Sequence, residues 1–289
     1  MKFALILNPG AGSTGDDTAE SLRRGAEKQG LECKIFSGND PGEAAKQAIE
    51  DGHRTLVACG GDGTVGAVAA AILASDTPDL RLGIVPLGTG NFIAAALGIS
   101  TDLEEAFATL ARPKEKPLDV GFANGKPFLI GAGLGVAEEF IRRTDDEQKS
   151  LLGRLAYVFG LLRTDRGRRF RLELTHDGQT MSRVATSVVV GNIWSAERLS
   201  AIESAADDDG VFEAVIHHRL TWRDVLETAW FAMRGDLAKT RAATVVTGSS
   251  FEVRTHPPLP VQLDGNDAEL TTPVTIEVAR RRLTVLVQD

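Results

Sequence analysis

The sequence contains very little cysteine, and this scarcity excludes several classes of protein. Cys33 and Cys59 are the two cysteines among 289 residues, and both fall inside predicted strands. We therefore expect buried thiols rather than a disulfide, which favours a cytoplasmic protein. The five histidines include the adjacent pair His217 and His218 but have no spacing typical of metal ligands. We therefore expect neither a disulfide framework nor a histidine metal site.

Long hydrophobic runs and an excess of positive charge are also missing. No apolar stretch approaches the roughly 20 residues that a membrane-spanning helix needs, so we expect no transmembrane segment. The N-terminal run 3–7 stops at Asn8-Pro9-Gly10, too early for a signal peptide, and is predicted to be a first strand. The formal net charge of −8 argues against a nucleic-acid partner. The length favours two domains.

Short strand-like and helical runs alternate in the first part of the chain, which is predicted to form one domain over residues 1–115. A βαβα order is typical of a doubly wound parallel sheet with helices on both faces. The predicted strands are 3–7, 32–36, 55–59 and 82–85, and the predicted helices are 18–29, 41–51 and 65–74.

The pattern changes after residues 112–117, which we interpret as a linker rich in proline and charge. A second domain over residues 116–279 is predicted to be β-rich, an antiparallel sandwich-like structure with hairpin turns at Asn124-Gly125 and Asp177-Gly178. Helices near 150–163 and 221–234 interrupt it, and a last strand at about 280–289 can return to the first domain. Its predicted strands are 126–131, 169–176, 183–190, 211–217, 250–254, 261–263, 274–279 and 283–287.

Three glycine-containing turns follow predicted strands of the first domain, namely 8–12, 60–64 and 86–91. The carboxyl ends of parallel strands meet at one sheet edge, and glycine lets a phosphate approach backbone N–H groups at a helix N-terminus. Asp62 lies within the second turn, where a carboxylate suits a phosphate when a divalent cation lies between them. The alternative is an ordinary tight turn, with Asp62 as a helix N-cap and with Thr89 or Asn91 capping the helix 92–97.

Two familiar nucleotide motifs fit the glycines less well. Residues 10–15 match G-x-G-x-x-G, but Asp16 and Asp17 would face the pyrophosphate, and no acidic residue clearly ends the second strand. A Walker P-loop would need a lysine after the glycines, and none is present. A Rossmann dehydrogenase and a P-loop protein are therefore disfavoured.

Together the motifs resemble the catalytic domain of diacylglycerol kinase-type lipid kinases, which include bacterial lipid kinases, sphingosine kinases and ceramide kinases. The first-domain motifs are Asn8-Pro9-x-x-Gly12, Gly60-Gly61-Asp62-Gly63-Thr64 and Pro86-Leu87-Gly88-Thr89-Gly90-Asn91. The resemblance continues through Leu118-Asp119-Val120-Gly121, Gly133-Leu134-Gly135, Asp209-Gly210-Val211 and Leu263-Asp264-Gly265. It spans nearly the whole chain.

The resemblance implies an ATP- and Mg²⁺-dependent kinase with a lipid hydroxyl as acceptor. It implies nucleotide contacts from Asn8, Gly12, Gly60, Gly61, Asp62, Gly63, Thr64, Gly66, Gly88, Thr89 and Asn91. It also implies a structural Mg²⁺ site at Asp209, with backbone carbonyls near Ala206 and Val211. From the residues alone, the acidic run 207–209 before Gly210 fits either a cation site or a solvated loop.

The sequence departs from the family pattern at the expected base. The usual Asp-Gly-Glu motif reads Asp264-Gly265-Asn266 here, and an amide cannot take a proton at neutral pH. A glutamate expected after Gly60–Thr64 is replaced by Gly66 and Ala67, and a glycine-rich run near 192–195 is absent. Because phosphoryl transfer depends mainly on positioning and charge neutralisation, activity need not be lost. Asp62 and Asp264 remain the candidate catalytic residues.

An apolar stretch, 151–162, is followed by a cluster of arginines that could rest on an anionic membrane surface. The alternative is a core helix with ordinary flanking charges. The arginines are Arg163, Arg166, Arg168, Arg169 and Arg171.

The sequence thus predicts a lipid kinase that acts peripherally at the inner membrane face. NAD kinase, which shares the Gly-Gly-Asp-Gly-Thr turn, and a non-catalytic nucleotide- or lipid-binding regulator are the alternatives. Diacylglycerol, a sphingoid base and ceramide all fit as acceptor, and the oligomeric state stays open, with a homodimer as one alternative.

Overall fold

The computed structural model describes residues 2–9, 17–135, 169–191, 210–218, 227, 230, 239, 241 and 243–288. The chain divides into two compact units. Unit 1 comprises Met1–Val120 and Arg280–Asp289, and unit 2 comprises Gly121–Ala279. The strands β5 (Lys114–Ala123) and β16 (Val274–Val287) each contribute residues to both units. In the described part of the chain, no helix is both long enough and apolar enough to span a membrane.

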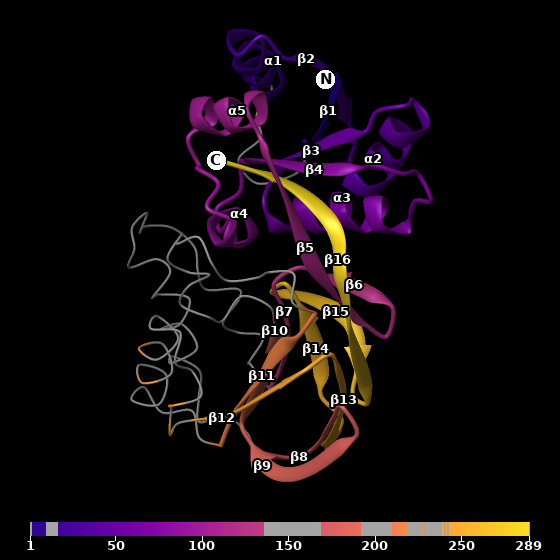
Figure 1. Cartoon of the computed structure of the whole chain (residues 1–289), viewed down its shortest axis with the longest axis vertical. Coiled ribbons are helices and arrows are strands. Elements are labelled where there is room, and N and C mark those ends of the chain that lie inside the picture. The colour runs from indigo at the N-terminus through magenta and orange to yellow at the C-terminus, as the bar shows by residue number, and fades with distance from the viewer. Residues whose placement is uncertain are drawn as a thin grey trace. The chain divides into compact units, whose positions relative to one another are not determined.

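Unit 1 is built on a parallel sheet in the order β2-β1-β3-β4, to which the end of β16 adds in parallel beside β4 (Figure 1). Helices cover both of its faces, with α1 near α5 and α2 near α3. The strands are β1 (Lys2–Leu7), β2 (Glu32–Ser37), β3 (Thr55–Gly60) and β4 (Arg81–Pro86). The helices are α1 (Thr18–Lys28), α2 (Pro41–Glu50), α3 (Asp62–Ala74), α4 (Phe92–Ala96) and α5 (Leu103–Ala111).

Burial explains why these short runs become central strands. Every residue of β3 is buried, and β1 is buried from Phe3 onward, as expected for parallel strands covered on both faces. On one face, alternate residues of β1 pack with Leu22 of α1 and with Phe107 and Leu110 of α5. Asp40 caps α2 by accepting hydrogen bonds from the Gly42 and Glu43 amides at 2.8 and 3.2 Å.

Unit 2 contains two antiparallel arrays. One is a six-stranded sheet in the order β12-β11-β10-β7-β14-β15, and the other continues from the start of β16 through β13 and β8 to β9. The strands are β6 (Lys126–Phe128), β7 (Gly131–Leu134), β8 (Phe170–His176), β9 (Gln179–Ala185), β10 (Ser187–Gly191), β11 (Phe212–His217), β12 (Ala243–Gly248), β13 (Ser250–His256), β14 (Pro260–Leu263) and β15 (Asn266–Thr271).

A single hydrophobic cluster joins the two arrays. It includes Phe128, Phe170, Phe212 and Phe251, each at most 4% exposed. The rings of Phe128 and Phe212 lie 5.8 Å apart between centroids. The predicted fold class, a doubly wound parallel-sheet domain followed by a β-rich sandwich-like domain, is confirmed.

Some sequence expectations differ from the structure in detail. The linker predicted at 112–117 is wrong from residue 114 onward, because β5 begins at Lys114 and the predicted boundary at 115/116 falls inside that strand. The run predicted as one strand at 183–190 is divided at Thr186 between β9 and β10. Strands β12 and β15 are missing from the predicted set, although Ala268 and Leu270 of β15 alternate with polar residues. The helices predicted near 150–163 and 221–234 lie outside the described residues, apart from isolated positions.

Candidate functional site

The carboxyl ends of β1, β3 and β4 lie side by side in unit 1. Leu7 pairs with Cys59, Cys59 with Val85, and Gly60 with Pro86. The segments that follow these strands therefore leave the same sheet edge, as the sequence predicts for its three glycine turns. The first turn is described only as far as Pro9, with Asn8 half-buried, and Gly12 lies outside the described residues.

The second turn leads directly from β3 into α3. Gly61 is the N-cap of α3, with φ −90° and ψ −170°, and its carbonyl accepts hydrogen bonds from the Thr64 and Val65 amides. Amides in the first turn of a helix lack intrahelical partners and carry a partial positive charge. A strand that leads through glycine into a helix N-terminus is a geometry in which proteins commonly bind anions.

Gly60 and Thr64 fit together beneath this turn. A Cβ on Gly60 would lie 2.3 Å from Thr64 Oγ1, so a larger residue would collide with that side chain. Thr64 is 4% exposed, and its hydroxyl therefore faces the protein rather than solvent. Its placement suits a role in shaping the turn.

The second and third turns touch each other through glycine. A Cβ on Gly88 would lie 2.5 Å from the Gly61 Cα, and the Leu87 amide donates a hydrogen bond to the Gly60 carbonyl at 3.0 Å. Backbones approach this closely only where no side chain intervenes. The structure thus brings the predicted segments 60–64 and 86–91 into one wall.

Asn91 closes the third turn with its side chain. Its Oδ1 accepts a hydrogen bond from the Gly88 amide at 3.0 Å, and its Nδ2 donates to the Gly88 carbonyl at 2.5 Å. Asn91 is the N-cap of α4 in the left-handed region, with φ +49°, but its side chain makes no capping bond to α4. Thr89 and Gly90, at the tip of the turn, are exposed. The prediction that Thr89 or Asn91 caps this helix by its side chain is therefore wrong.

Asp62 links the two turns. It is the first residue of α3 rather than its N-cap, and its Oδ1 accepts a hydrogen bond from the Ile93 amide of α4 at 2.8 Å. A Cβ on Gly90 would lie 3.2 Å from Asp62 Oδ2. The carboxylate therefore stands between α3 and the start of α4, half-buried at the edge of the wall.

Asp264 lies in unit 2, at the corner between β14 and β15. It adopts φ +49°, and its carboxylate accepts three backbone hydrogen bonds. Oδ2 accepts from the Leu129 amide at 2.8 Å, and Oδ1 accepts from Ile130 at 2.7 Å and from Gly131 at 3.0 Å. Charge-assisted bonds of this kind are stronger than neutral ones. They fix this carboxylate to the start of β7.

Asn266 follows Asp264 at the start of β15 and is exposed. Its amide donates a long hydrogen bond of 3.3 Å to the Asp264 carbonyl. The position at which the family pattern has a glutamate is thus at the surface, next to the fixed carboxylate.

Asp119 is a buried acid that the sequence reasoning did not select as a site residue. It is 0% exposed within β5, and its Oδ1 accepts a hydrogen bond of 2.7 Å from the amide of Arg281, which has φ +50°. Charged side chains are rarely fully buried without partners. The sequence signal for this buried acid is an aspartate between two apolar residues, Leu118 and Val120.

The two thiols are free, and they lie on strands β2 and β3, which β1 separates. Cys59 is buried, and desolvation strongly raises its pKa above the ordinary value. Cys33 is half-buried, and its pKa is also raised, chiefly by burial. Neither environment produces the thiolate that a reactive cysteine needs.

The described residues do not supply enough side-chain ligands for a metal site built from protein groups alone. Among them, no group of three or more His, Cys, Asp or Glu side chains is placed to hold a metal ion. Of the implied Mg²⁺ site, Val211 is described, whereas Ala206 and Asp209 are not. The arginine-flanked stretch 151–168 also lies outside the described residues.

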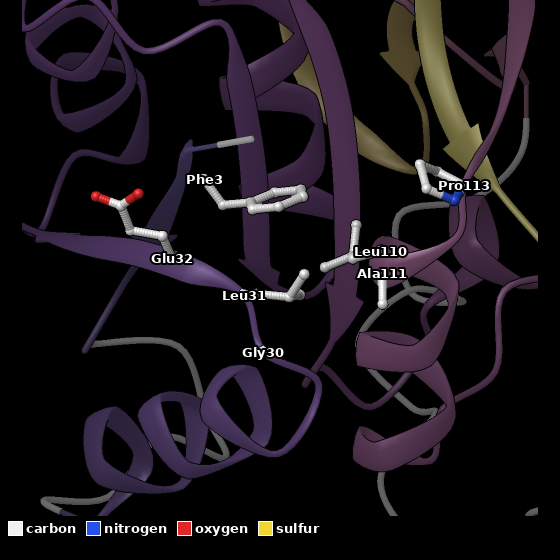
Figure 2. A pocket seen from close by; sticks show the side chains of 7 residues that line it. All are labelled: Phe3, Gly30, Leu31, Glu32, Leu110, Ala111 and Pro113. Carbon is white, nitrogen blue, oxygen red and sulfur yellow. The ribbon is translucent and has the colours of Figure 1, made fainter.

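A shallow pocket of about 320 Å³ occurs elsewhere in unit 1 (Figure 2). It lies at the opposite sheet edge, near the amino ends of β1 and β2. Phe3 and Leu110 face it, whereas the Glu32 carboxylate points away. Its lining residues are Phe3, Gly30, Leu31, Glu32, Leu110, Ala111 and Pro113. It contains none of the predicted site residues. The wall formed by segments 60–64 and 86–91 remains the better candidate for the functional site.

Comparisons with known proteins agree with the two-unit plan. Residues 2–123 match the diacylglycerol kinase catalytic domain, and residues 132–287 match the YegS C-terminal NAD kinase beta sandwich-like domain. A diacylglycerol kinase of Bacillus subtilis is 28% identical over 92% of this chain and 90% of its own length. An uncharacterised protein of Synechocystis is 30% identical over 84% of this chain but 57% of its own length.

Solved structures also agree with the two-unit plan. A proposed diacylglycerol kinase of Bacillus anthracis superposes with a TM-score of 0.79 at 25% identity, covering 99% of this chain and 97% of that one. An NAD kinase of Archaeoglobus fulgidus in complex with ATP superposes with a TM-score of 0.54 at 12% identity, covering 100% and 94%. The second likeness shows a shared fold and no more.

Proposed function

Because the chain belongs to the diacylglycerol kinase catalytic-domain family, we propose that it transfers the γ-phosphoryl group of ATP to the primary hydroxyl of a lipid. The observation that carries the proposal is the close approach of Gly61 and Gly88, which joins two glycine turns at the start of α3. Diacylglycerol, a sphingoid base or ceramide is the proposed acceptor class. A lipid acceptor also means that the enzyme works at a membrane surface.

The nucleotide phosphates are proposed to bind along this wall. The exposed Gly63 and Thr89, and the amides at the start of α3, supply donors, while Gly60, Thr64 and Asn91 hold the backbone in shape. Asn8 borders the same edge at the end of β1. Neither turn contains lysine or arginine. Backbone N–H groups and the α3 dipole therefore supply most of the attraction for phosphate.

Asp62 fits a divalent cation that arrives with the nucleotide. Mg²⁺ is typically held by one or two carboxylates together with phosphates and water, so a single aspartate beside the phosphate wall suffices. Oδ1 is committed to Ile93, which leaves Oδ2 oriented toward Gly90. When bound, Mg²⁺ would neutralise the charge that develops on the phosphates.

Asp264 is proposed to orient the acceptor side of the reaction. Its three amide bonds hold the segment 129–131, and the lone-pair capacity left on a carboxylate can accept the acceptor hydroxyl. In the transfer, the hydroxyl oxygen forms a bond to the γ-phosphorus as the bond to ADP breaks. The proton leaves late in a loose transition state, so a weakly basic carboxylate, Asp264 or Asp62, is adequate where Asn266 cannot serve.

The proposal is tested with purified protein, ATP, Mg²⁺ and a panel of lipids that present a primary hydroxyl. Asp62→Asn is the test variant, compared with the wild type. Its amide oxygen can still accept the Ile93 hydrogen bond, so the substitution removes the charge with little change in structure. We expect phospholipid formation by the wild type and a loss of at least about a hundredfold in kcat for the variant. Equal turnover by both proteins would remove Asp62 from the reaction.

The same preparation tests the two alternatives. NADP formation from NAD and ATP would favour an NAD kinase, a reading that the shared fold motivates. ATP binding without turnover on any lipid or on NAD would favour a regulator, which Asn266 at the position of the expected base motivates.

A further inference from the structure

One large hydrophobic side chain stands beside the phosphate wall. Phe92, the first residue of α4, is 39% exposed, whereas the next two residues, Ile93 and Ala94, are each 1% exposed. Among the described residues, the other large hydrophobics with such exposure are Val184, Val211 and Trp230, all in unit 2. Phe92 is therefore distinctive within unit 1.

The position of this ring is fixed by its neighbours. Asn91 clamps the turn before it, and the Ile93 amide after it is bonded to Asp62. The ring lies along Gly90, since a Cβ there would be 2.7 Å from Phe92 Cε2. The same Cβ would be 3.2 Å from Asp62 Oδ2, so the ring and the carboxylate flank one glycine. A partly exposed aromatic ring on a backbone held at both sides is well suited to ligand contact.

We propose that Phe92 contacts the hydrocarbon chain of the lipid acceptor and so acts as a specificity-determining residue. This inference rests on the proposed function. The acceptor hydroxyl must reach the γ-phosphorus, and its apolar chain then begins only a few bonds away. An apolar surface next to Asp62, the carboxylate that would hold Mg²⁺, is placed to contact that chain. An adenine base, by contrast, is separated from the phosphates by the ribose.

The kinetic test compares Phe92→Ala and Phe92→Leu with the wild type, using dioctanoylglycerol in mixed micelles. We expect kcat/KM for this lipid to fall about tenfold in the alanine variant and to recover largely in the leucine variant, because leucine restores apolar contact. The KM for ATP should not change. Val184→Ala, at an exposed hydrophobic position of β9, is the matched control and should behave as the wild type.

Two outcomes, one kinetic and one from vesicle binding, would overturn the inference. A rise in the KM for ATP would place the ring against the nucleotide. Weaker binding to phosphatidylglycerol vesicles, with unchanged kinetics on micellar lipid, would place it in the bilayer.

A second measurement does not depend on turnover. A diacylglycerol with a diazirine in its acyl chain is photolysed with the protein, and labelled peptides are mapped by mass spectrometry. We expect labelling in the peptide that contains Phe92 and less labelling there in Phe92→Ala. Labelling without kinase activity would refute the proposed function and, with it, the role of Phe92 in acceptor specificity, leaving only a lipid contact at this residue. Activity without labelling near residue 92 would refute the inference alone.

Discussion

A single methyl group added at Gly88 should separate the two turns of the phosphate wall. The new Cβ would lie 2.5 Å from the Gly61 Cα and 2.9 Å from Asn91 Oδ1, well inside the 3.4–4 Å of ordinary contact. Both obstacles are held in place, one by being backbone and the other by its hydrogen bonds to Gly88. Overpacking of this kind costs about 1–3 kcal/mol. We expect Gly88→Ala to lower the free energy of unfolding by about 2 kcal/mol and to weaken ATP binding.

Gly63→Ala is the informative partner of this variant. Nothing lies within 4 Å of a Cβ on Gly63, and alanine in α3 favours the helix over glycine by up to about 1 kcal/mol. The fold should thus be as stable as the wild type or slightly more so. ATP affinity should nevertheless fall at least about tenfold, because the methyl group occupies the surface on which a phosphate is proposed to rest. Stability and binding are predicted to move in different directions.

Urea unfolding followed by circular dichroism measures the first quantity, and isothermal titration calorimetry with ATP and Mg²⁺ measures the second. Gly133→Ala serves as a control in unit 2, since its Cβ also meets nothing within 4 Å. If Gly63→Ala bound ATP as tightly as the wild type, phosphate would not rest on this turn. If Gly88→Ala were fully stable, the contact between the turns would not constrain the fold.

Three further predictions concern residues outside the wall. Asp264→Ala leaves three amides without their carboxylate partner and should reduce the free energy of unfolding by about 3–5 kcal/mol in urea titrations; Asp264→Asn, which retains one acceptor oxygen, should cost roughly half as much, and equal losses would contradict this account. Asp119→Leu removes the acceptor of the Arg281 amide and should cost about 2–3 kcal/mol by the same measurement, whereas a neutral result would show that the bond is dispensable. Burial raises the pKa of Cys59 in the folded state, so the thiol of the unfolded chain ionises first as the pH rises above the ordinary value of 9.0. The contribution of this thiol to the free energy of unfolding should therefore be constant below that pH and decline above it. Cys59→Ala should show a shallower decline in stability between pH 9 and 10.5, and an identical slope would exclude this thiol as the cause.

Several features of the fold follow from local sequence patterns. The strands β1, β3 and β4 are short, largely apolar runs that lead into glycine-containing turns, and such runs form parallel strands only when helices cover both faces. The helix signals were equally local, as at Asp40, where an acceptor side chain precedes proline at the first position of α2. The order of glycine turns could therefore be predicted, because parallel strands present their carboxyl ends at one edge.

Other features depend on residues that are distant in sequence. The first residues of β5, 114–117, have the composition of a linker because Pro113 and Pro117 flank charged residues, yet β5 pairs with β16, more than 150 residues away, as well as with the nearby β6. Strand β7 likewise lies between β10 and β14, which come much later in the sequence. Single-sequence patterns carry no information about such partners.

The sequence by itself determined which residue types the candidate site contains, since glycine, aspartate and asparagine at fixed positions follow from the chemistry of phosphate binding. Only the tertiary structure decided what each side chain does. It directs Asp62 to the Ile93 amide, Asn91 back to its own turn, Thr64 into the interior and Asp264 onto the start of β7. The physical reason is that a short polar side chain takes the donor or acceptor that the folded backbone places within about 3 Å, and that partner is set by packing rather than by sequence distance.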